Sequence, residues 1–211
     1  DLPPTYLHLA GPSRVQRGEP FTMRASLLDS LGNPSTEFAA DLNVTAGTER
    51  WEGVFRPPHA GWIAWEMRLD DVGIFRLEGE ARDLTSVSHP IEVVEGSLER
   101  GLYWGDIHTH HGHAFEEEDG DWRDQNHEYA RDVLGLQLGC ESTKGQPVEI
   151  NAEKVWEDLK RSCRELSEPG RYLALLGFEW ASRRAGHHNV YFDNCTAPLV
   201  HHERVRTLDG S

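Results

Sequence analysis

The chain has 211 residues, of which 36 are Asp or Glu and 21 are Lys or Arg, so its formal net charge is −15. Nucleic-acid binding depends on cations that neutralise phosphates, so this charge balance does not favour a nucleic-acid partner. Hydrophobic residue types make up 37% of the chain, enough for a folded core, but no stretch approaches the roughly 20 apolar residues of a membrane span. The N-terminus lacks the charged-then-apolar pattern of a signal peptide, which slightly favours a cytoplasmic location. The oligomeric state stays open.

Short segments within residues 1–98 alternate apolar and polar side chains with a period of two, for example at 21–25, 62–67 and 74–79. Turn-forming sequences rich in Gly, Pro and Asp separate these segments. Such a pattern is typical of an antiparallel β-sandwich, and about 90–100 residues is the usual size of an immunoglobulin-like domain. We therefore expect an immunoglobulin-like β-sandwich over residues 1–98.

Residues 99–211 follow a different pattern, in which expected strands and helices alternate. Strands are expected at 102–108, 172–180 and 188–192, and helices at 124–134 and from Asn151 to Pro169. The second helix is indicated by apolar residues three or four positions apart, at 155, 159, 163 and 166. The nearly continuous apolar run 172–180 predicts a strand buried on both faces, as in a parallel sheet. Strand–helix alternation predicts an α/β domain over 99–211.

The chain contains three cysteines, Cys140, Cys163 and Cys195, with no C-x-x-C spacing. They are too few and too scattered to predict a disulfide framework, a cysteine zinc site or a redox dithiol.

Histidines and one glutamate form a candidate metal site. His108 and His110 are two residues apart at the end of an expected strand, so both side chains can point to one face and meet one metal ion. Glu179 ends the apolar strand, where α/β sheets place their ligands, and His187 precedes the next strand. A mixed nitrogen and oxygen set suits Zn²⁺, Mn²⁺ or Fe²⁺ better than Ca²⁺ or Mg²⁺. Taken singly, these residues are also compatible with surface histidines and a salt-bridged or capping glutamate.

Three motifs together resemble a known family. Residues 102–110 resemble the opening motif of the PHP superfamily (polymerase and histidinol phosphatase). Residues 175–180 and 186–192 resemble a little-characterised branch in which a β-sandwich often precedes the PHP-like domain. The resemblance implies a distorted (β/α)7 barrel with two or three metal ions. Because such a barrel needs on the order of 200–250 residues, we expect residues 99–211 to hold only its first half.

The resemblance also assigns candidate ligands. His108 and His110 would form the first metal pair, Glu179 would match the family's strand-end glutamate, often a bridging ligand, and His187 would match the next histidine. These four are the candidate catalytic residues.

The resemblance implies two further metal ligands, at positions where this sequence matches the family's motif less closely. Asp119 is closest to the Asp that the family places after its H-x-H motif, with His113 as a rival. Where the family carries another metal histidine, this sequence reads Cys140-Glu141-Ser142, and Glu141 would supply a carboxylate instead, with Cys140 as another option for a soft metal. The family's late Asp-x-His motif has no counterpart.

The function implied is metal-dependent hydrolysis of a phosphoester, with a metal-bound hydroxide as nucleophile and a neighbouring histidine as acid. Arg183 and Arg184 are candidates for neutralising phosphate charge. A net charge of −15 repels polyanions at long range, so we expect a small-molecule phosphoester. Hydrolysis of a C–N or C–O bond stays open. The alternative is a non-catalytic binding or accessory protein in which a β-sandwich is fused to a degenerate metal domain.

Overall fold

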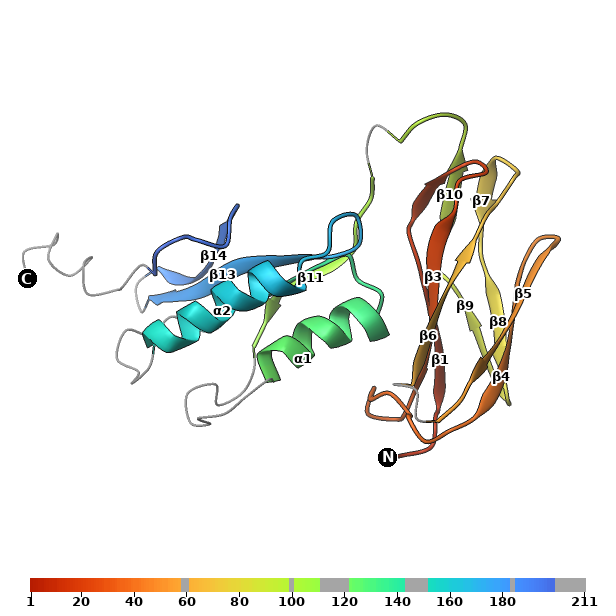
Figure 1. Ribbon diagram of the computed structural model, residues 1–211, viewed down its shortest axis with the longest axis horizontal. Helices are drawn as coiled ribbons and strands as arrows, with labels where there is room; N and C mark the ends of the chain where they lie inside the picture. Colours follow the sequence, from red (N-terminus) through yellow and green to blue (C-terminus); the bar gives the residue numbers. More distant parts are fainter. Residues whose placement is uncertain (58–60, 99–100, 111–121, 143–151, 183–184, 200–211) are drawn as a thin grey trace, which may run out of the picture. The chain divides into compact units, whose positions relative to one another are not determined.

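A computed structural model describes residues 1–57, 61–98, 101–110, 122–142, 152–182 and 185–199 (Figure 1). The chain divides into two compact units, which are described separately. The first comprises Asp1–Tyr103 with Asp132–Gly135, and the second comprises Trp104–Arg131 with Leu136–Ser211.

The first unit is built from ten described strands. They are β1 (Tyr6–Ala10), β2 (Arg14–Gln16), β3 (Phe21–Leu28), β4 (Ala40–Ala46), β5 (Glu49–Phe55), β6 (Trp62–Met67), β7 (Gly73–Phe75), β8 (Glu78–Ala81), β9 (Leu84–Val87) and β10 (Ile91–Val94). They form sheets in the orders β1-β3-β6, β5-β4-β8-β9 and β2-β10-β7. All pairings are antiparallel except that of β2 with β10.

Alternating side chains of these strands build one hydrophobic core. In β4, Leu42 and Val44 are buried whereas Asp41 and Thr45 are exposed, as a period of two requires. Met23, Leu27 and Phe55 lie in the same core with at most 1% of their surface exposed. Full burial of each such side chain is worth about 1.5–3 kcal/mol. The immunoglobulin-like β-sandwich predicted for this part of the chain is confirmed.

The described part of the second unit combines one sheet with two α-helices. Its elements are β11 (Gly105–Thr109), α1 (Trp122–Glu128), the π-helical turn η1 (Tyr129–Val133, which ends within the first unit), β12 (Leu138–Glu141), α2 (Ala152–Leu166), β13 (Leu173–Ser182) and β14 (Gly186–Phe192). The sheet order is β11-β12-β13-β14; the first three strands are parallel and β14 is antiparallel to β13 (Figure 1). None of the described helices is long and apolar enough to cross a membrane.

Helix α2 covers one face of this sheet. Its residues Val155, Trp156 and Leu159 are buried in a cluster with Leu176 and Phe178 of β13. The apolar spacing in the sequence predicted this helix correctly, because residues three and four positions apart share one face of a helix. The even-numbered residues of β13 therefore face α2, and the odd-numbered residues face away from it.

The α/β barrel predicted for residues 99–211 is wrong. The described part of the second unit is an open mixed sheet, and its last two strands form an antiparallel hairpin. Only residues 183–185 separate β13 from β14. A parallel crossover needs about a dozen residues or more, so this connection is too short for another β–α–β unit.

A disulfide joins Cys163 of α2 to Cys195, which follows β14; their Cα atoms are 5.7 Å apart. The bond encloses β13 and β14. Cys140 is a free, buried cysteine. The cysteine spacing in the sequence does not reveal this pair, because the two cysteines are 32 positions apart and meet only when the hairpin packs on α2.

A buried histidine makes the stability of the second unit depend on pH. His127 of α1 is 5% exposed, and its Nδ1 lies 2.9 Å from the Tyr172 hydroxyl. Burial lowers the pKa of His127 to about 4, from an ordinary value of 6.5. The folded chain therefore binds a proton less readily than the unfolded chain. The resulting stabilisation is complete above about pH 6.5 and is lost as the pH falls towards 4.

Because His127 is protonated more readily in the unfolded chain, we expect it to lower the free energy of unfolding by about 2–3 kcal/mol when the pH falls from 7.5 to 4.5. Urea unfolding at the two pH values measures this loss. In the His127→Gln variant the loss of unfolding free energy should be smaller than in the wild type by about that amount. The His188→Gln variant, which changes an exposed histidine, should retain the wild-type pH dependence. Equal pH dependence in wild type and His127→Gln would contradict the prediction.

Candidate metal centre

The two histidines of the H-x-H motif lie at the end of β11, next to an irregularity in the sheet. The register between β11 and β12 shifts between Asp106 and Thr109, and a bulge of this kind re-aims the side chains beside it. Thr109 accepts a hydrogen bond from the Asn126 amide of α1 at 2.9 Å, so its side chain lies on the helix side of the sheet. His108 and His110, the residues on either side of Thr109, point to the opposite face.

Glu179 reaches the same face from β13. It is an odd-numbered residue of this strand and therefore points away from α2, yet it is only 2% exposed. Gly177, two residues earlier, permits close packing there: a Cβ at this position would lie 2.7 Å from the Cys140 Sγ and 2.8 Å from the Val190 carbonyl oxygen. The strand thus positions a buried carboxylate opposite the two imidazoles.

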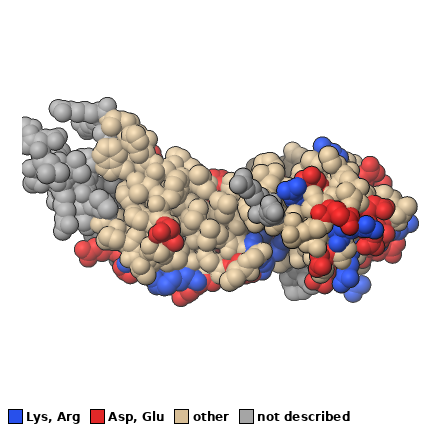
Figure 2. Space-filling model, turned by 90° about the horizontal axis from the view of Figure 1, so that it is seen from above, with Lys and Arg blue, Asp and Glu red and all other residues tan. Residues whose placement is uncertain are grey.

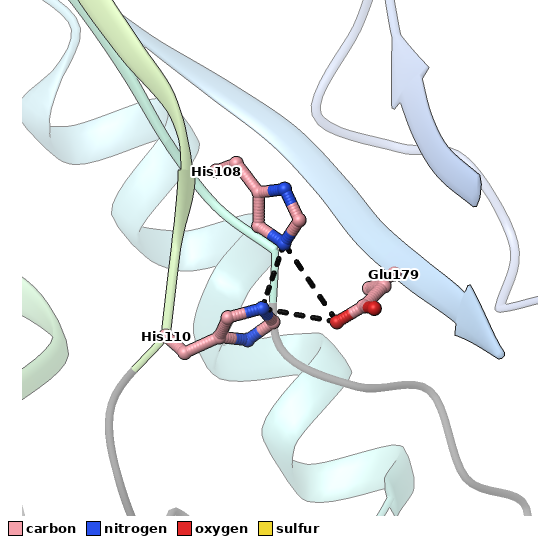
Figure 3. Close-up of side chains that lie close together, drawn as sticks. All are labelled: His108, His110 and Glu179. Carbon is pink, nitrogen blue, oxygen red and sulfur yellow. Dashed lines mark hydrogen bonds and ion pairs between the residues drawn. The ribbon is translucent and has the colours of Figure 1, made fainter. Parts of the chain in front are cut away.

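Three potential ligand atoms converge in this arrangement (Figure 3). The Nε2 atoms of His108 and His110 are 2.8 Å apart. The Glu179 Oε2 lies 2.9 Å from the Nε2 of His110 and 3.8 Å from that of His108. The three side chains form the one group of His, Cys, Asp and Glu residues, among those that the structure describes, whose ligand atoms all lie within 4.8 Å of one another.

The buried oxygen of Glu179 fits a bound cation. Among the described residues, Oε2 has no hydrogen-bond partner, although the Nε2 of His110 is only 2.9 Å away. A buried carboxylate oxygen is costly unless a cation or a donor compensates it. Two imidazole nitrogens and one carboxylate oxygen around a common point are the donor set of catalytic zinc sites and of non-haem iron sites.

His187 contacts the other oxygen of the same carboxylate. Its Nδ1 forms a short contact with the Glu179 Oε1, and its side chain is 55% exposed. His188, the next residue of β14, points to the opposite face of the sheet. It packs on Trp180, and its Nε2 hydrogen-bonds to the Ala185 carbonyl oxygen. The structure therefore brings together His108, His110, Glu179 and His187, the four residues that the sequence analysis selected as catalytic candidates.

Glu141 does not join this cluster. It is 1% exposed and pairs in register with Thr109, on the helix side of the sheet. Cys140 faces the side of Glu179, but burial, together with a smaller effect of Glu141, raises the pKa of its thiol to about 12. A protonated thiol is a poor metal ligand. Asp119 and its rival His113 lie outside the described residues, as do Arg183 and Arg184.

Two residues of β14 that the sequence analysis did not select also reach the site. The Asn189 side-chain amide lies 2.8 Å from the Nδ1 of His108, and the Tyr191 hydroxyl donates to the Ile107 carbonyl oxygen at 2.8 Å. Burial raises the pKa of Tyr191, with Cys140 as a further cause, so this hydroxyl remains a donor. The alternation of β14 places both side chains on the face of His187, a signal that was present in the sequence.

No family model and no curated protein matches this chain. Among solved structures, a PKD domain of a human VPS10 domain-containing receptor is 18% identical, covering 46% of this chain and 79% of its own, with a TM-score of 0.35. A CARDB domain from Pyrococcus furiosus is 13% identical, covering 44% of this chain and 97% of its own, with a TM-score of 0.33. A putative superoxide reductase from Thermotoga maritima is 14% identical, covering 43% of this chain and 86% of its own, with a TM-score of 0.32.

These comparisons correct the family assignment. The resemblance to the PHP superfamily is wrong: no family model supports it. The four-stranded mixed sheet of the second unit also differs from the barrel that the resemblance implied. The short motifs around His108, Glu179 and His187 suggested the family because they place potential metal ligands next to expected strands, but such local motifs do not determine how the strands pair. The solved structures are too distant to assign a function.

Proposed function

We propose that this chain is a metal-dependent hydrolase whose centre is formed by His108, His110 and Glu179. The observation that carries the proposal is the convergence of two imidazole nitrogens on a buried carboxylate oxygen that lacks a hydrogen bond among the described residues. This donor set suits Zn²⁺, Mn²⁺ or Fe²⁺. When bound, such an ion would supply Lewis acidity and lower the pKa of a coordinated water.

Each protein ligand has a distinct part in this proposal. The side chains of His108 and His110 are 45% and 36% exposed, so they offer nitrogen ligands at a surface that a substrate can reach. Glu179 supplies the negative charge from the buried side of the site. With three protein ligands among the described residues, coordination positions remain for water and substrate, as in catalytic zinc sites.

His187 is suited to proton transfer. Its Nδ1 is oriented by the Glu179 Oε1, which leaves Nε2 on an exposed ring to face a substrate. A carboxylate that holds one imidazole nitrogen fixes the tautomer and orientation of the ring. We propose that His187 donates a proton to the leaving group, a contribution of about 10²–10⁴-fold for a well-placed acid.

A small phosphoester is the substrate class that fits best. The net charge of −15 opposes long polyanions, whereas a single phosphate group can bind at an exposed cationic centre. In the view of Figure 2, Lys, Arg, Asp and Glu gather mainly on the first unit, and the described part of the second unit shows few of them. Among the described residues of the second unit seen in this view, Lys and Arg form no broad cationic surface for a nucleic acid.

The test is hydrolysis of 4-nitrophenyl phosphate by purified protein loaded with Zn²⁺, Mn²⁺ or Fe²⁺. We expect turnover, and we expect His187→Gln to lower kcat at least about 100-fold when both proteins are measured at a saturating concentration of the metal ion. The matched control is His188→Gln, which changes the neighbouring histidine that points away from Glu179 and should keep wild-type turnover. Absence of turnover on phosphate, ester and amide substrates with all three ions would overturn the proposal. Metal binding without turnover would favour the non-catalytic accessory protein.

A further inference from the structure

Asn189 lies next to two of the proposed metal ligands, Glu179 and His108. In the register of the hairpin it lies directly opposite Glu179, and its side-chain amide reaches the Nδ1 of His108 at 2.8 Å. Asn189 and His108 are 81 positions apart in the chain, and two strands separate β11 from β14 in the sheet. The amide therefore links β11, which carries His108, to β14, which lies beside Glu179, on the face of the sheet opposite α2.

The proton on His108 decides whether it can bind a metal. A neutral imidazole carries a proton on one nitrogen and a lone pair on the other. The Nε2 of His108 faces His110 and Glu179, so it must keep its lone pair to act as a ligand. The proton then resides on Nδ1, and Nδ1 needs an acceptor.

A 180° flip of the Asn189 side-chain amide would place its oxygen, Oδ1, where it can accept the hydrogen bond from the Nδ1–H of His108. The nitrogen and oxygen of an amide have nearly the same size, so the flip exchanges a donor for an acceptor in the same space. In the orientation observed, the Asn189 Oδ1 is buried and has no hydrogen-bond partner among the described residues. Turning the amide would satisfy this oxygen and would hold His108 in the ligand form.

We propose that Asn189 is a positioning residue of the metal centre, which fixes the His108 tautomer through a hydrogen bond from Nδ1. The inference rests on the proposed metal centre and adds a residue that does not itself touch the ion. Residues that hold a metal-binding histidine in this way commonly change metal affinity by 10–100-fold.

The first test measures Zn²⁺ affinity by calorimetry. Asn189→Ala removes the acceptor and should weaken binding 10–100-fold. Asn189→Asp has the same shape and can only accept, so it should bind Zn²⁺ at least as tightly as the wild type. The matched controls are Asn194→Ala and Asn194→Asp, which change an exposed asparagine whose side chain bonds to Asp193 and Thr196. Wild-type affinity in Asn189→Ala would overturn the inference while leaving the proposed function standing.

The second test does not need a bound metal. Long-range ¹H–¹⁵N spectra of histidine-labelled protein show which ring nitrogen carries the proton. In metal-free Asn189→Asp we expect the His108 proton on Nδ1, and in Asn189→Ala we expect this preference to be lost. If the wild type binds no Zn²⁺, the proposed function fails, whereas a shifted tautomer in Asn189→Asp would still support the control of His108 by residue 189. An unchanged tautomer in both variants would overturn that control.

Discussion

We expect the Glu179→Gln variant to lose at least about 100-fold in Zn²⁺ affinity. Glutamine preserves the shape of the side chain but removes the negative charge that faces His108 and His110 at 3.8 and 2.9 Å. Mutation of a residue that only hydrogen-bonds to a metal ligand typically lowers metal affinity by 10–100-fold. The loss of a charged ligand should therefore have no smaller effect. Calorimetric titration of metal-free protein with Zn²⁺ measures this change.

The same variant should respond differently to heat. A ligand that binds only the folded state stabilises it by about 2.7 kcal/mol at a free concentration of 100 times Kd. The wild type should therefore show a higher Tm for its second unit in Zn²⁺, whereas Glu179→Gln should show little change at the same concentration. An equal rise of Tm in both proteins would contradict the assignment of Glu179 as a ligand.

Two further variants make this prediction specific. His188→Gln changes a histidine of the same hairpin that lies on the opposite face, and it should retain wild-type affinity. Glu141→Gln tests the other buried carboxylate that the sequence analysis proposed as a ligand. From its place on the helix side of the sheet, we expect Glu141→Gln to bind Zn²⁺ within about threefold of the wild type. A loss as large as that of Glu179→Gln would make Glu141 a ligand.

Breaking the disulfide should destabilise the second unit by about 3–4 kcal/mol. The bond between Cys163 and Cys195 spans 32 positions, and a cross-link over a loop of that length restricts the unfolded chain by about this amount. Because the loop contains β13 and β14, the hairpin that carries Glu179 should be affected directly. Urea unfolding of the Cys163→Ser/Cys195→Ser double variant, compared with oxidised wild type, measures the effect.

A reducing agent provides the control for this prediction. Wild type and Cys140→Ala both retain the disulfide and should lose stability when a thiol reductant is added. The double variant should be insensitive to the reductant. If reductant does not change the unfolding midpoint of the wild type, the predicted stabilisation is wrong. Because disulfides persist in oxidising compartments, the oxidation state of Cys163 and Cys195 in freshly isolated protein would also test the cytoplasmic location predicted from the sequence.

Local sequence patterns predicted several elements correctly. The alternation in β3, where Met23 and Ala25 are buried and Thr22 is exposed, follows from the two-residue period of a strand. The buried face of α2 follows from the three- and four-residue spacing of its apolar side chains. The pairing of His108 with His110 has the same origin, since residues two apart in an extended segment share a face. In each case the side-chain direction depends only on local backbone geometry.

The barrel was predicted wrongly because alternation of strands and helices does not determine how strands pair. Residues 176–179 of β13 are buried on both faces, as expected for a parallel strand, but one neighbour of β13 is the parallel β12 and the other is the antiparallel β14. The short connection at 183–185 was the available signal, since it permits only a hairpin.

The amino-acid sequence by itself determined the sandwich pattern and the amphipathic helix, and it indicated Glu179, His108 and His110 as candidate ligands, because each depends on local spacing and residue chemistry. His187 was selected through the family resemblance. Only the tertiary structure decided that Glu141 faces the helices, that Cys163 meets Cys195, and that Asn189 reaches His108. These relations join positions far apart in the chain or depend on sheet register. A shift of one residue in register turns a side chain to the other face, and the spacing within one strand does not specify its register against a strand that is distant in the chain.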